Sequence, residues 1–335
     1  MGFLVVDPLN DATRWSAVAA DGVTPSSVVT IVDDPAGAPP GSDGVCALLT
    51  ASSAATGHAV RRDLAPLDLA QFTELRLSIS ADRTAGPPER NFFLELRLGS
   101  PALPLSDPAN TWHRLIPVRT SRTWETVRCS IDDLPTAVSG QLTRIQLRCV
   151  DAPFVARLND LTAVDPRPVA DADAALTTAL TGIKLGTTIV PVRVRTGAEP
   201  IPAAPAIDIV QSGLRFAPDR TITALVPRDF RAGEVRTVSA GNAYELDYAI
   251  RVPAATRADQ TRLLETVLDR LGVLGELPFA GESLPIELVP GSTDPAQFED
   301  TPVLRYRVAV RSRDRVASPT WLVREVLVDA HHLEV

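Results

Sequence analysis

The sequence predicts a two-domain protein: an antiparallel β-sandwich, then an α+β domain built from a sheet and one main helix. The length of 335 residues suits about two domains. Apolar and polar residues alternate in several short runs of the first half, whereas a clear helical pattern occurs in the second half. Proline (29 residues) outnumbers glycine (19 residues), which favours β-rich domains with many turns and extended connectors.

The first domain, expected over residues 1–165, carries four runs with a two-residue period: "LRLSIS", "FFLELRLGS", "TVRCSI" and "LTRIQLRCV". Every second residue of such a strand faces the core. The inward residues are Leu75, Leu77, Ile79, Phe92, Leu94, Leu96, Leu98, Val127, Cys129, Ile131, Ile145, Leu147 and Cys149. The outward ones include Phe93, Arg144, Gln146 and Arg148. We interpret Cys129 and Cys149 as small core residues rather than redox groups.

Prolines and aspartates mark the boundary between the domains. Pro166 and Pro168 stiffen a linker that we expect over residues 166–172. Asp171 or Asp173 can cap a following helix, because a carboxylate accepts hydrogen bonds from the free N–H groups of the first turn. The second domain is then expected to span residues 173–335.

A strand and a helix dominate the second domain. Alternation from Tyr244 to Ile250 predicts a strand with one wet face. Thr256 can cap the next helix, and Gly272 suits its C-terminal cap. The apolar face of this helix carries Leu263, Leu264, Val267, Leu268 and Leu271. With the later alternating run "VLRYRVAVR", these elements predict an antiparallel or mixed sheet with a helix packed on it.

The sequence carries no motif of a known catalytic chemistry. It has no Walker A, GxGxxG, HExxH, CxxC or GxSxG pattern. The four histidines, His58, His113, His331 and His332, would have to converge from distant positions to form a triad or a zinc site. We therefore expect that the protein is not an enzyme.

Charge and hydropathy limit the expected partners. The formal net charge is −8, which argues against a nucleic-acid binder with a strongly basic face. No apolar run approaches the roughly 18 residues that suggest a membrane span, and the N-terminus lacks the pattern of a secretion signal. We expect a chain made in the cytoplasm without a signal peptide, with no specific nucleic-acid binding and no membrane span.

The segment "TWHRLIPVRTSRTW" contains the best candidate ligand site. Trp112, His113, Arg114 and Trp124 lie around an expected turn, and sugars stack their C–H faces on exposed tryptophan rings. The alternative interpretation is that both tryptophans pack in the core or at its rim.

The first half resembles the galactose-binding-like jelly rolls of carbohydrate-binding modules. The resemblance lies in "APLDLAQFTELRLSISAD", "FFLELRLGS", "RTWETVRCSIDDL" and "FVARLNDLTAV", with Trp124 before an acidic turn and Asp160 in the closing strand. It implies a jelly-roll-like sandwich and a possible glycan partner. It also implies a structural calcium near the termini, for which Asp7, Asp11 and Asp160 are candidate ligands. No other cofactor is expected. The usual Asp-Asp closing pair is Asn159-Asp160 here.

The second half resembles tail-terminator domains of phage tails and contractile injection systems. The order of the helix "DADAALTTALTGI", the strand "PAIDIVQSGLRF" and the Tyr244–Gly272 strand and helix carries the resemblance. It implies a homo-oligomeric ring that meets other tail, neck or capsid proteins in a virion or phage-like particle. Candidate interface residues are Glu245, Asp247, Arg251, Arg305, Arg307 and Arg311. The alternative is that these residues form solvated strand faces.

Two functional hypotheses follow. The leading one is a structural component of a phage or phage-like (contractile injection) particle, either a ring-forming tail terminator or a neck or tail protein, with a decorating β-sandwich. The alternative is a non-catalytic glycan-binding or adhesin module that its C-terminal domain anchors to a particle or surface.

Overall fold

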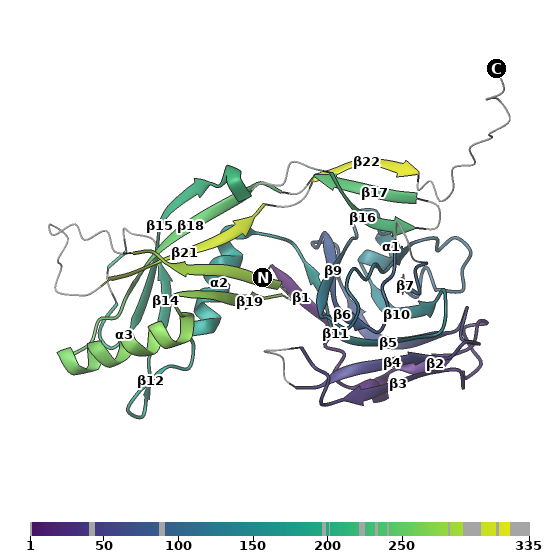
Figure 1. Cartoon of the computed structure of the whole chain (residues 1–335), viewed down its shortest axis with the longest axis horizontal. Coiled ribbons are helices and arrows are strands. Elements are labelled where there is room, and N and C mark those ends of the chain that lie inside the picture. The colour runs from purple at the N-terminus through teal and green to yellow at the C-terminus, as the bar shows by residue number, and fades with distance from the viewer. Residues whose placement is uncertain are drawn as a thin grey trace, which may run out of the picture. The chain divides into compact units, whose positions relative to one another are not determined.

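The computed structural model describes the chain over residues 2–39, 44–86, 91–195, 199–200, 202–220, 225–231, 234–239, 241–280, 282–290, 303–312 and 315–321. The chain divides into two compact units (Figure 1). The sandwich unit comprises Val5–Ala163, Ala224–Ser239 and Arg315–Val335. The α+β unit comprises Met1–Leu4, Val164–Thr223 and Ala240–Asp314.

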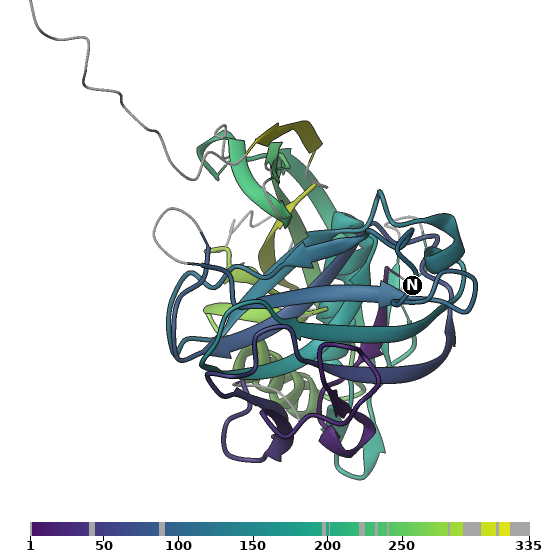
Figure 2. The ribbon, with the colours of Figure 1, turned by 90° about the vertical axis from the view of Figure 1, so that its right-hand side faces the viewer.

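The sandwich unit is built from two β-sheets, whose strands cross the view in Figure 2. The first sheet has the order β3-β4-β11-β6-β9, with β1 paired to β11. Its strands are β1 (Phe3–Asp7), β3 (Val29–Asp34), β4 (Cys46–Ala51), β6 (Glu74–Ala81), β9 (Glu125–Ser130) and β11 (Phe154–Val164). A 3-10 turn (Ala12–Arg14) and the short helix α1 (Thr136–Ser139) lie in its connections.

The second sheet has the order β2-β5-β10-β7-β8-β16-β17-β22. Its strands are β2 (Ser16–Val18), β5 (Ala59–Leu67), β7 (Leu94–Gly99), β8 (His113–Leu115), β10 (Leu142–Cys149), β16 (Leu225–Arg231), β17 (Glu234–Ser239) and β22 (Arg315–Trp321). The neighbouring pairs from β2 to β22 are antiparallel.

Alternating side chains form the sandwich core, as the sequence predicted. The inward residues of β6, β7, β9 and β10 are all buried, and the three cysteines are buried thiols that form no disulfide with one another. Burial raises the pKa of Cys46 to about 11 and that of Cys149 to about 12, so both remain inert thiols at neutral pH. Phe93 was expected to face outward, but it is fully buried with its ring 4.5 Å from that of Phe154. The reason is that β7 begins only at Leu94, so its period does not extend to Phe93.

Three strands from the second half of the sequence complete the second sheet. Phe230 of β16 pairs with Leu115 of β8, and β17 and β22 follow outward. Phe92, Leu115, Phe230 and Val235 form a small apolar cluster, with the rings of Phe92 and Phe230 5.1 Å apart. The contiguous division expected at residues 165–173 therefore differs from the observed one, because the chain returns twice to the sandwich.

The α+β unit has a mixed sheet of order β14-β15-β18-β21-β20-β19, in which β14 and β15 are parallel. Its strands are β14 (Val192–Arg195), β15 (Ile207–Phe216), β18 (Ala243–Arg251), β19 (Leu274–Phe279), β20 (Glu282–Leu288) and β21 (Val303–Arg311). The hairpin β12 (Lys184–Leu185) and β13 (Thr188–Ile189) and a 3-10 turn (Pro218–Arg220) complete the unit.

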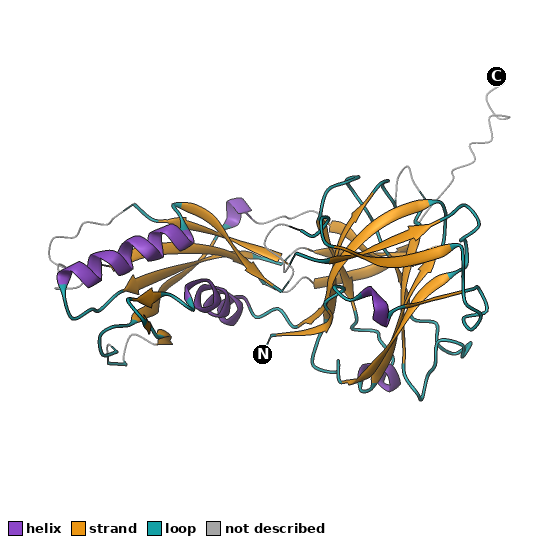
Figure 3. Ribbon diagram, turned by 90° about the horizontal axis from the view of Figure 1, so that it is seen from below, coloured by secondary structure: helices purple, strands orange, loops and turns teal. Residues whose placement is uncertain are grey.

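Two helices pack on this sheet (Figure 3): α2 (Pro168–Leu180) and α3 (Arg257–Leu271). Leu176 of α2 and Leu263 of α3 are buried in one core with Leu246 and Tyr248 of β18. The predicted caps of α3 are confirmed, since Thr256 Oγ1 accepts from the backbone N–H of Asp259 and Gly272 ends the helix with a positive φ of 69°. No helix in the described ranges is long and apolar enough to cross a membrane.

The helix α2 begins earlier than the sequence suggested. Pro168 is its first residue, so most of the expected linker at 166–172 is helical. Proline suits this position because the first N–H groups of a helix have no partner within it. Asp171 lies in the first turn, and its carboxylate accepts a hydrogen bond from the N–H of Arg167 at 2.8 Å.

Candidate functional site

Two of the four residues of the predicted aromatic site, Trp112 and Arg114, lie in a buried structural cluster of the sandwich unit. Trp112 is 3% exposed, and its Nε1 donates to Asp133 Oδ1 at 3.1 Å. The guanidinium of Arg114, which is fully buried, lies 4.8 Å from the centre of the Trp112 ring. His113 and Trp124 are both half-buried. Trp112 therefore does not present a ring face on which a sugar could stack.

Carboxylates surround the buried guanidinium of Arg114. Arg114 Nη2 donates to Asp133 Oδ1 at 2.5 Å and to the carbonyl of Ser130 at 2.8 Å. Asp229 of β16 is also fully buried, with its Oδ1 3.7 Å from Arg114 Nε. Burial lowers the pKa of Arg114, and the charge of Asp229 opposes that change. Because Asp229 also accepts from the N–H of Ser130 at 2.8 Å, the cluster fastens β16 to the rest of the sandwich.

Two more arginines from the returning strands join the cluster. Arg231 of β16 and Arg236 of β17 both pair with Asp133, the latter at 3.0 Å. Burial first, and then the charges of Arg114 and Arg236, lower the pKa of Arg231 to about 10. The whole cluster is thus a set of ions that are paired within the chain.

The three calcium candidates do not converge. Asp7 is buried and ion-paired with Arg62, and its Oδ1 accepts from the N–H of Leu9 at 2.7 Å. Asp11 pairs with Arg14 at 2.6 Å, whereas Asp160 accepts from the side-chain amide of Asn159 at 2.9 Å. Within the described part of the chain, no group of three or more His, Cys, Asp or Glu side chains could hold a metal ion.

Three of the six predicted interface residues, Glu245, Asp247 and Arg307, lie in an ion-pair ladder on the sheet face opposite the helices. Arg215 meets Glu245 at 2.6 Å, and Arg307 meets Asp247 and Glu287 at 3.0 Å each. These pairs lie directly across neighbouring strands, which brings the charges together. The ladder is therefore neutralised inside the chain, and its role as an interface stays a prediction.

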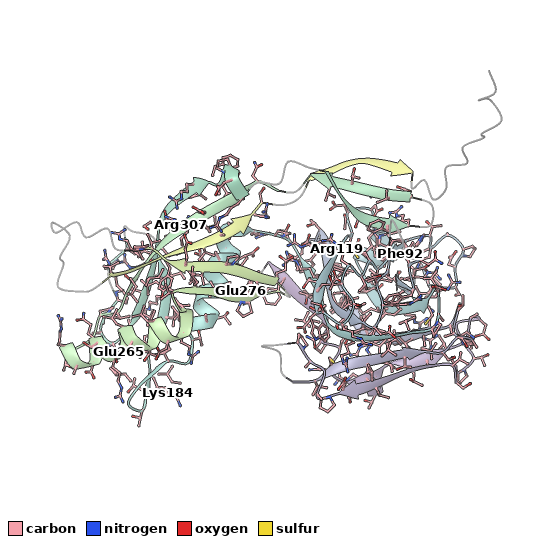
Figure 4. All side chains as sticks on the ribbon, in the orientation of Figure 1. Phe92, Arg119, Lys184, Glu265, Glu276 and Arg307 are labelled. Carbon is pink, nitrogen blue, oxygen red and sulfur yellow. The ribbon has the colours of Figure 1, made fainter. Side chains whose placement is uncertain are left out.

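The remaining predicted interface arginines lie around the ladder. Arg311, at the end of β21, donates to the carbonyl of Arg220 at 2.5 Å. Arg251 is half-buried opposite Asp208 and Val303 in the register of the sheet, and Arg305 is half-buried opposite Ala249. Arg307 and Glu276, both labelled in Figure 4, line a hollow of about 270 Å³ beside β19 and β20.

A larger pocket lies on the outer face of the second sheet of the sandwich unit. We call it the Gln146 pocket, and its volume is about 420 Å³. Side chains of β5, β7 and β10 form its floor, and two loops form its walls. Its lining residues are Ala20, Asp21, Gly22, Val23, Gly57, Arg61, Arg97, Leu105, Ser106, Arg144, Gln146 and Arg148.

Gln146 lies at the centre of the floor. In the register of the sheet it is flanked by Arg61 of β5 and Arg97 of β7. Its side chain is 92% buried, since the residue is 8% exposed, yet its Oε1 has no hydrogen-bond partner. A buried unpaired carbonyl costs about 1–3 kcal/mol, so this atom is a strong acceptor without a donor.

Both walls of the Gln146 pocket are held in place by the chain. Asp21 accepts from the N–H groups of Val23 and Thr24 at 2.8 and 2.9 Å. These bonds, after the one from the Thr24 hydroxyl, lower the pKa of Asp21 to about 2. On the other side the side-chain amide of Asn110 donates to the carbonyls of Leu98 and Leu103, at 3.0 and 3.1 Å.

Gly99 lets the second wall approach the sheet. A Cβ at this position would lie 2.9 Å from Leu105 Cγ, so only glycine permits the loop to close over the end of β7. The outward positions of β7 and β10 were visible in the sequence. What the sequence did not show is that two distant loops enclose them.

No protein-family model matches the sequence, and no curated protein matches it. Among solved structures, the chain is similar to a family 11 carbohydrate-binding module of a cellulosomal cellulase of Clostridium thermocellum (TM-score 0.34, 7% identity, 50% of this chain and 96% of that one). It is also similar to a family 27 module of Caldicellulosiruptor saccharolyticus solved with mannohexaose (TM-score 0.32, 10% identity, 48% and 96%). A third is tailspike protein 4 of bacteriophage CBA120 (TM-score 0.31, 10% identity, 47% of this chain and 20% of that one). Since all three TM-scores lie below 0.5, we base the functional proposal on the geometry of the chain itself.

Proposed function

We propose that this chain is a non-catalytic glycan-binding protein that holds its ligand in the Gln146 pocket. The observation that carries the proposal is the unpaired, buried Oε1 of Gln146 beneath a ring of arginines. A saccharide hydroxyl can donate to this oxygen once the side chains that cover it move aside, while its own lone pairs accept from guanidinium N–H groups. The volume of about 420 Å³ lies within the range of ligand pockets.

The titratable groups of the pocket favour binding over catalysis. Its lining holds four arginines and Asp21. General acid–base catalysis needs a group whose pKa lies near the working pH. The pKa of Asp21 is about 2, and arginine stays protonated, so neither exchanges a proton readily at neutral pH.

A glycan array probed with the full chain tests the proposal, followed by calorimetry on the strongest saccharide. We expect Gln146→Leu to weaken binding at least tenfold, since it removes the buried acceptor. Arg119→Gln is the matched control, because Arg119 is an exposed residue of the same unit outside the pocket (Figure 4). Binding that survives Gln146→Leu would place the glycan elsewhere, and the absence of any bound glycan would refute the proposal.

A second candidate function, a structural role in a phage or phage-like particle, is favoured by exposed apolar residues on the α+β unit. Leu214 and Phe216 of β15 are 56% and 51% exposed, and Val273 and Leu274 are 65% and 80% exposed. These residues form two separate pairs, since β15 and β19 are not neighbours in the sheet, and each pair offers exposed apolar surface for a contact. In this proposal the α+β unit forms a tail-terminator-like ring that contacts tail, neck or capsid proteins, and the sandwich displays its pocket on the particle.

Native mass spectrometry of the full chain tests the second candidate. We expect a closed oligomer that Leu274→Asp or Phe216→Asp reduces to monomers, because a charge in an apolar contact is costly to bury. A chain that stays monomeric at all accessible concentrations would contradict self-assembly, yet it would leave glycan binding intact.

A further inference from the structure

We propose that the Gln146 pocket selects an acidic saccharide, one that carries a carboxylate or sulfate group, over its neutral counterpart. This inference rests on the proposed function and names the ligand class of the same site. It follows from the charge balance of the pocket, from the geometry of its arginines, and from the kind of side chains that line it.

The charge balance of the pocket is opposite to that of the chain. Arg61, Arg97, Arg144 and Arg148 line it against a single lining carboxylate, Asp21, whereas the chain as a whole has a formal net charge of −8. The carboxylate of Asp21 is already engaged within its own loop, since its two oxygens accept hydrogen bonds from Val23 and Thr24. A concave surface with excess positive charge concentrates anions.

The four arginines fall into two groups by how tightly they are held. Arg144 Nε donates to Asp63 Oδ1 at 2.5 Å, and Arg61 Nη1 donates to the carbonyl of Gly22 at 2.9 Å. These two contacts have the length of good hydrogen bonds and fix the frame of the pocket.

Arg97 and Arg148 are held more loosely: Arg97 Nη2 donates to the carbonyl of Asn110 at 3.3 Å, and both guanidinium groups share one carboxylate as their ionic partner. Glu95 lies 3.6 Å from Arg97 Nε and 3.8 Å from Arg148 Nη1. Charge-assisted hydrogen bonds are about 2.7–2.9 Å long, so Glu95 forms such a bond with neither arginine. Two guanidinium groups that share one distant carboxylate can take up a second anion, and their planar forks match a carboxylate or sulfate.

The lining of the pocket suits an acidic sugar better than a neutral one. Neutral sugars are commonly bound through stacking of their C–H faces on aromatic rings. The lining residues named above include no aromatic side chain, and Trp112 is committed to the Arg114 cluster. An acidic sugar instead combines hydroxyls for Gln146 with an anionic group for Arg97 and Arg148.

The test measures the binding of matched saccharide pairs to the full chain by calorimetry. One pair is trigalacturonic acid and its methyl ester, and the other is a sulfated κ-carrageenan tetrasaccharide, which carries no carboxylate, and its desulfated form. We expect at least one acidic member to bind about tenfold or more tightly than its partner, since hydrogen bonds to charged groups are the stronger ones. The pair that responds distinguishes carboxylate from sulfate. The difference in affinity between the two members of that pair should become smaller as the salt concentration is raised.

Variants of the pocket separate anion recognition from general damage. We expect Arg97→Gln and Arg148→Gln to remove the advantage of the acidic member, while Arg119→Gln leaves it unchanged. In the Gln146→Glu variant the new carboxylate pairs with the arginines of the pocket. The affinity for the acidic saccharide should therefore fall, while the melting temperature stays the same or rises. A melting temperature that is unchanged or raised would show that this variant is folded and that it loses binding for another reason.

Each other outcome counts against the inference. Equal binding of both members of each pair, still dependent on Gln146, would overturn the acidic class but keep glycan binding. If no array glycan binds, the proposed function falls as well. If oligo-dT binds as tightly as the acidic sugars and with the same arginine dependence, the pocket reads a phosphate backbone, and the inference is overturned.

Discussion

Two groups of arginines in the sandwich unit differ in whether the chain supplies their partners. Arg114, Arg231 and Arg236 meet Asp133 and Asp229 in a buried cluster. The four arginines of the Gln146 pocket surround an unpaired amide oxygen, and their ionic partners are Asp63 and Glu95. Each arginine of the first group forms an ion pair with Asp133, whereas Arg97 and Arg148 of the second group reach Glu95 only at 3.6 and 3.8 Å. Paired arginines hold the fold, and under-paired ones are available for binding.

The buried cluster should show the largest effect of any single change. Arg114→Met removes the cation from Asp229, which is fully buried, and should lower the free energy of unfolding by about 3–5 kcal/mol. Urea denaturation followed by tryptophan fluorescence measures the change. A loss below about 1 kcal/mol would mean that the cluster does not fasten β16, and the contrast with the pocket would fail.

The Gln146 pocket should respond in the opposite direction. Gln146→Leu replaces a buried unpaired carbonyl by an apolar group of similar size, so the free energy of unfolding should rise by about 1 kcal/mol. The same variant should lose its ligand. Stability that falls instead would show that a donor in the chain already satisfies Oε1.

The ion-pair ladder of the α+β unit should show a smaller effect. Arg307→Ala breaks contacts with Asp247 and Glu287, but these side chains are partly exposed. We expect a loss of about 0.5–1 kcal/mol that diminishes as salt is raised. A double-mutant cycle with Asp247→Ala isolates the pair. A salt-independent loss would indicate that packing, rather than charge, is at stake.

The hydrogen bond between the Asp173 carboxylate and the Tyr248 hydroxyl should give the smallest change in stability. Asp173 of α2 accepts from the Tyr248 hydroxyl at 2.8 Å, and burial raises the pKa of this carboxyl. A raised folded-state pKa means that the stabilisation is present below the unfolded value, 3.8, and is lost as pH rises through the folded value. The melting temperature of the wild type should therefore decline over that range more than that of Asp173→Asn. Parallel curves would contradict the assignment.

Local patterns predicted much of the fold. The period of two placed the core residues of β6, β9 and β10 correctly, and the caps of α3 follow directly from Thr256 and Gly272. Local signals also suggested a helix after Pro166, although not its true start at Pro168. Each of these features depends on residues that are near one another in sequence.

The features that escaped prediction depend on pairings across long sequence distances. Asp229 accepts a hydrogen bond from the backbone N–H of Ser130, which lies 99 residues away in sequence. No local pattern specifies such a partner. For the same reason the sequence did not show that Asp133 and Asp229 already occupy Arg114, beside Trp112. Gln146 was predicted to face outward, but its burial depends on loops from residues 20–23 and 105–106.

The return of β16, β17 and β22 to the sandwich also bears on how the chain folds as it is synthesised. An N-terminal domain ordinarily folds while the rest of the protein is still being made. Here the second sheet is completed only after residue 321 has been made. The edge of β8 and the rings near Phe92 must wait for Phe230 and its neighbours to arrive. Most of the sandwich therefore precedes the α+β unit in sequence but cannot be complete before residue 321 has been made, and a chain cut after residue 164 would leave it unfinished.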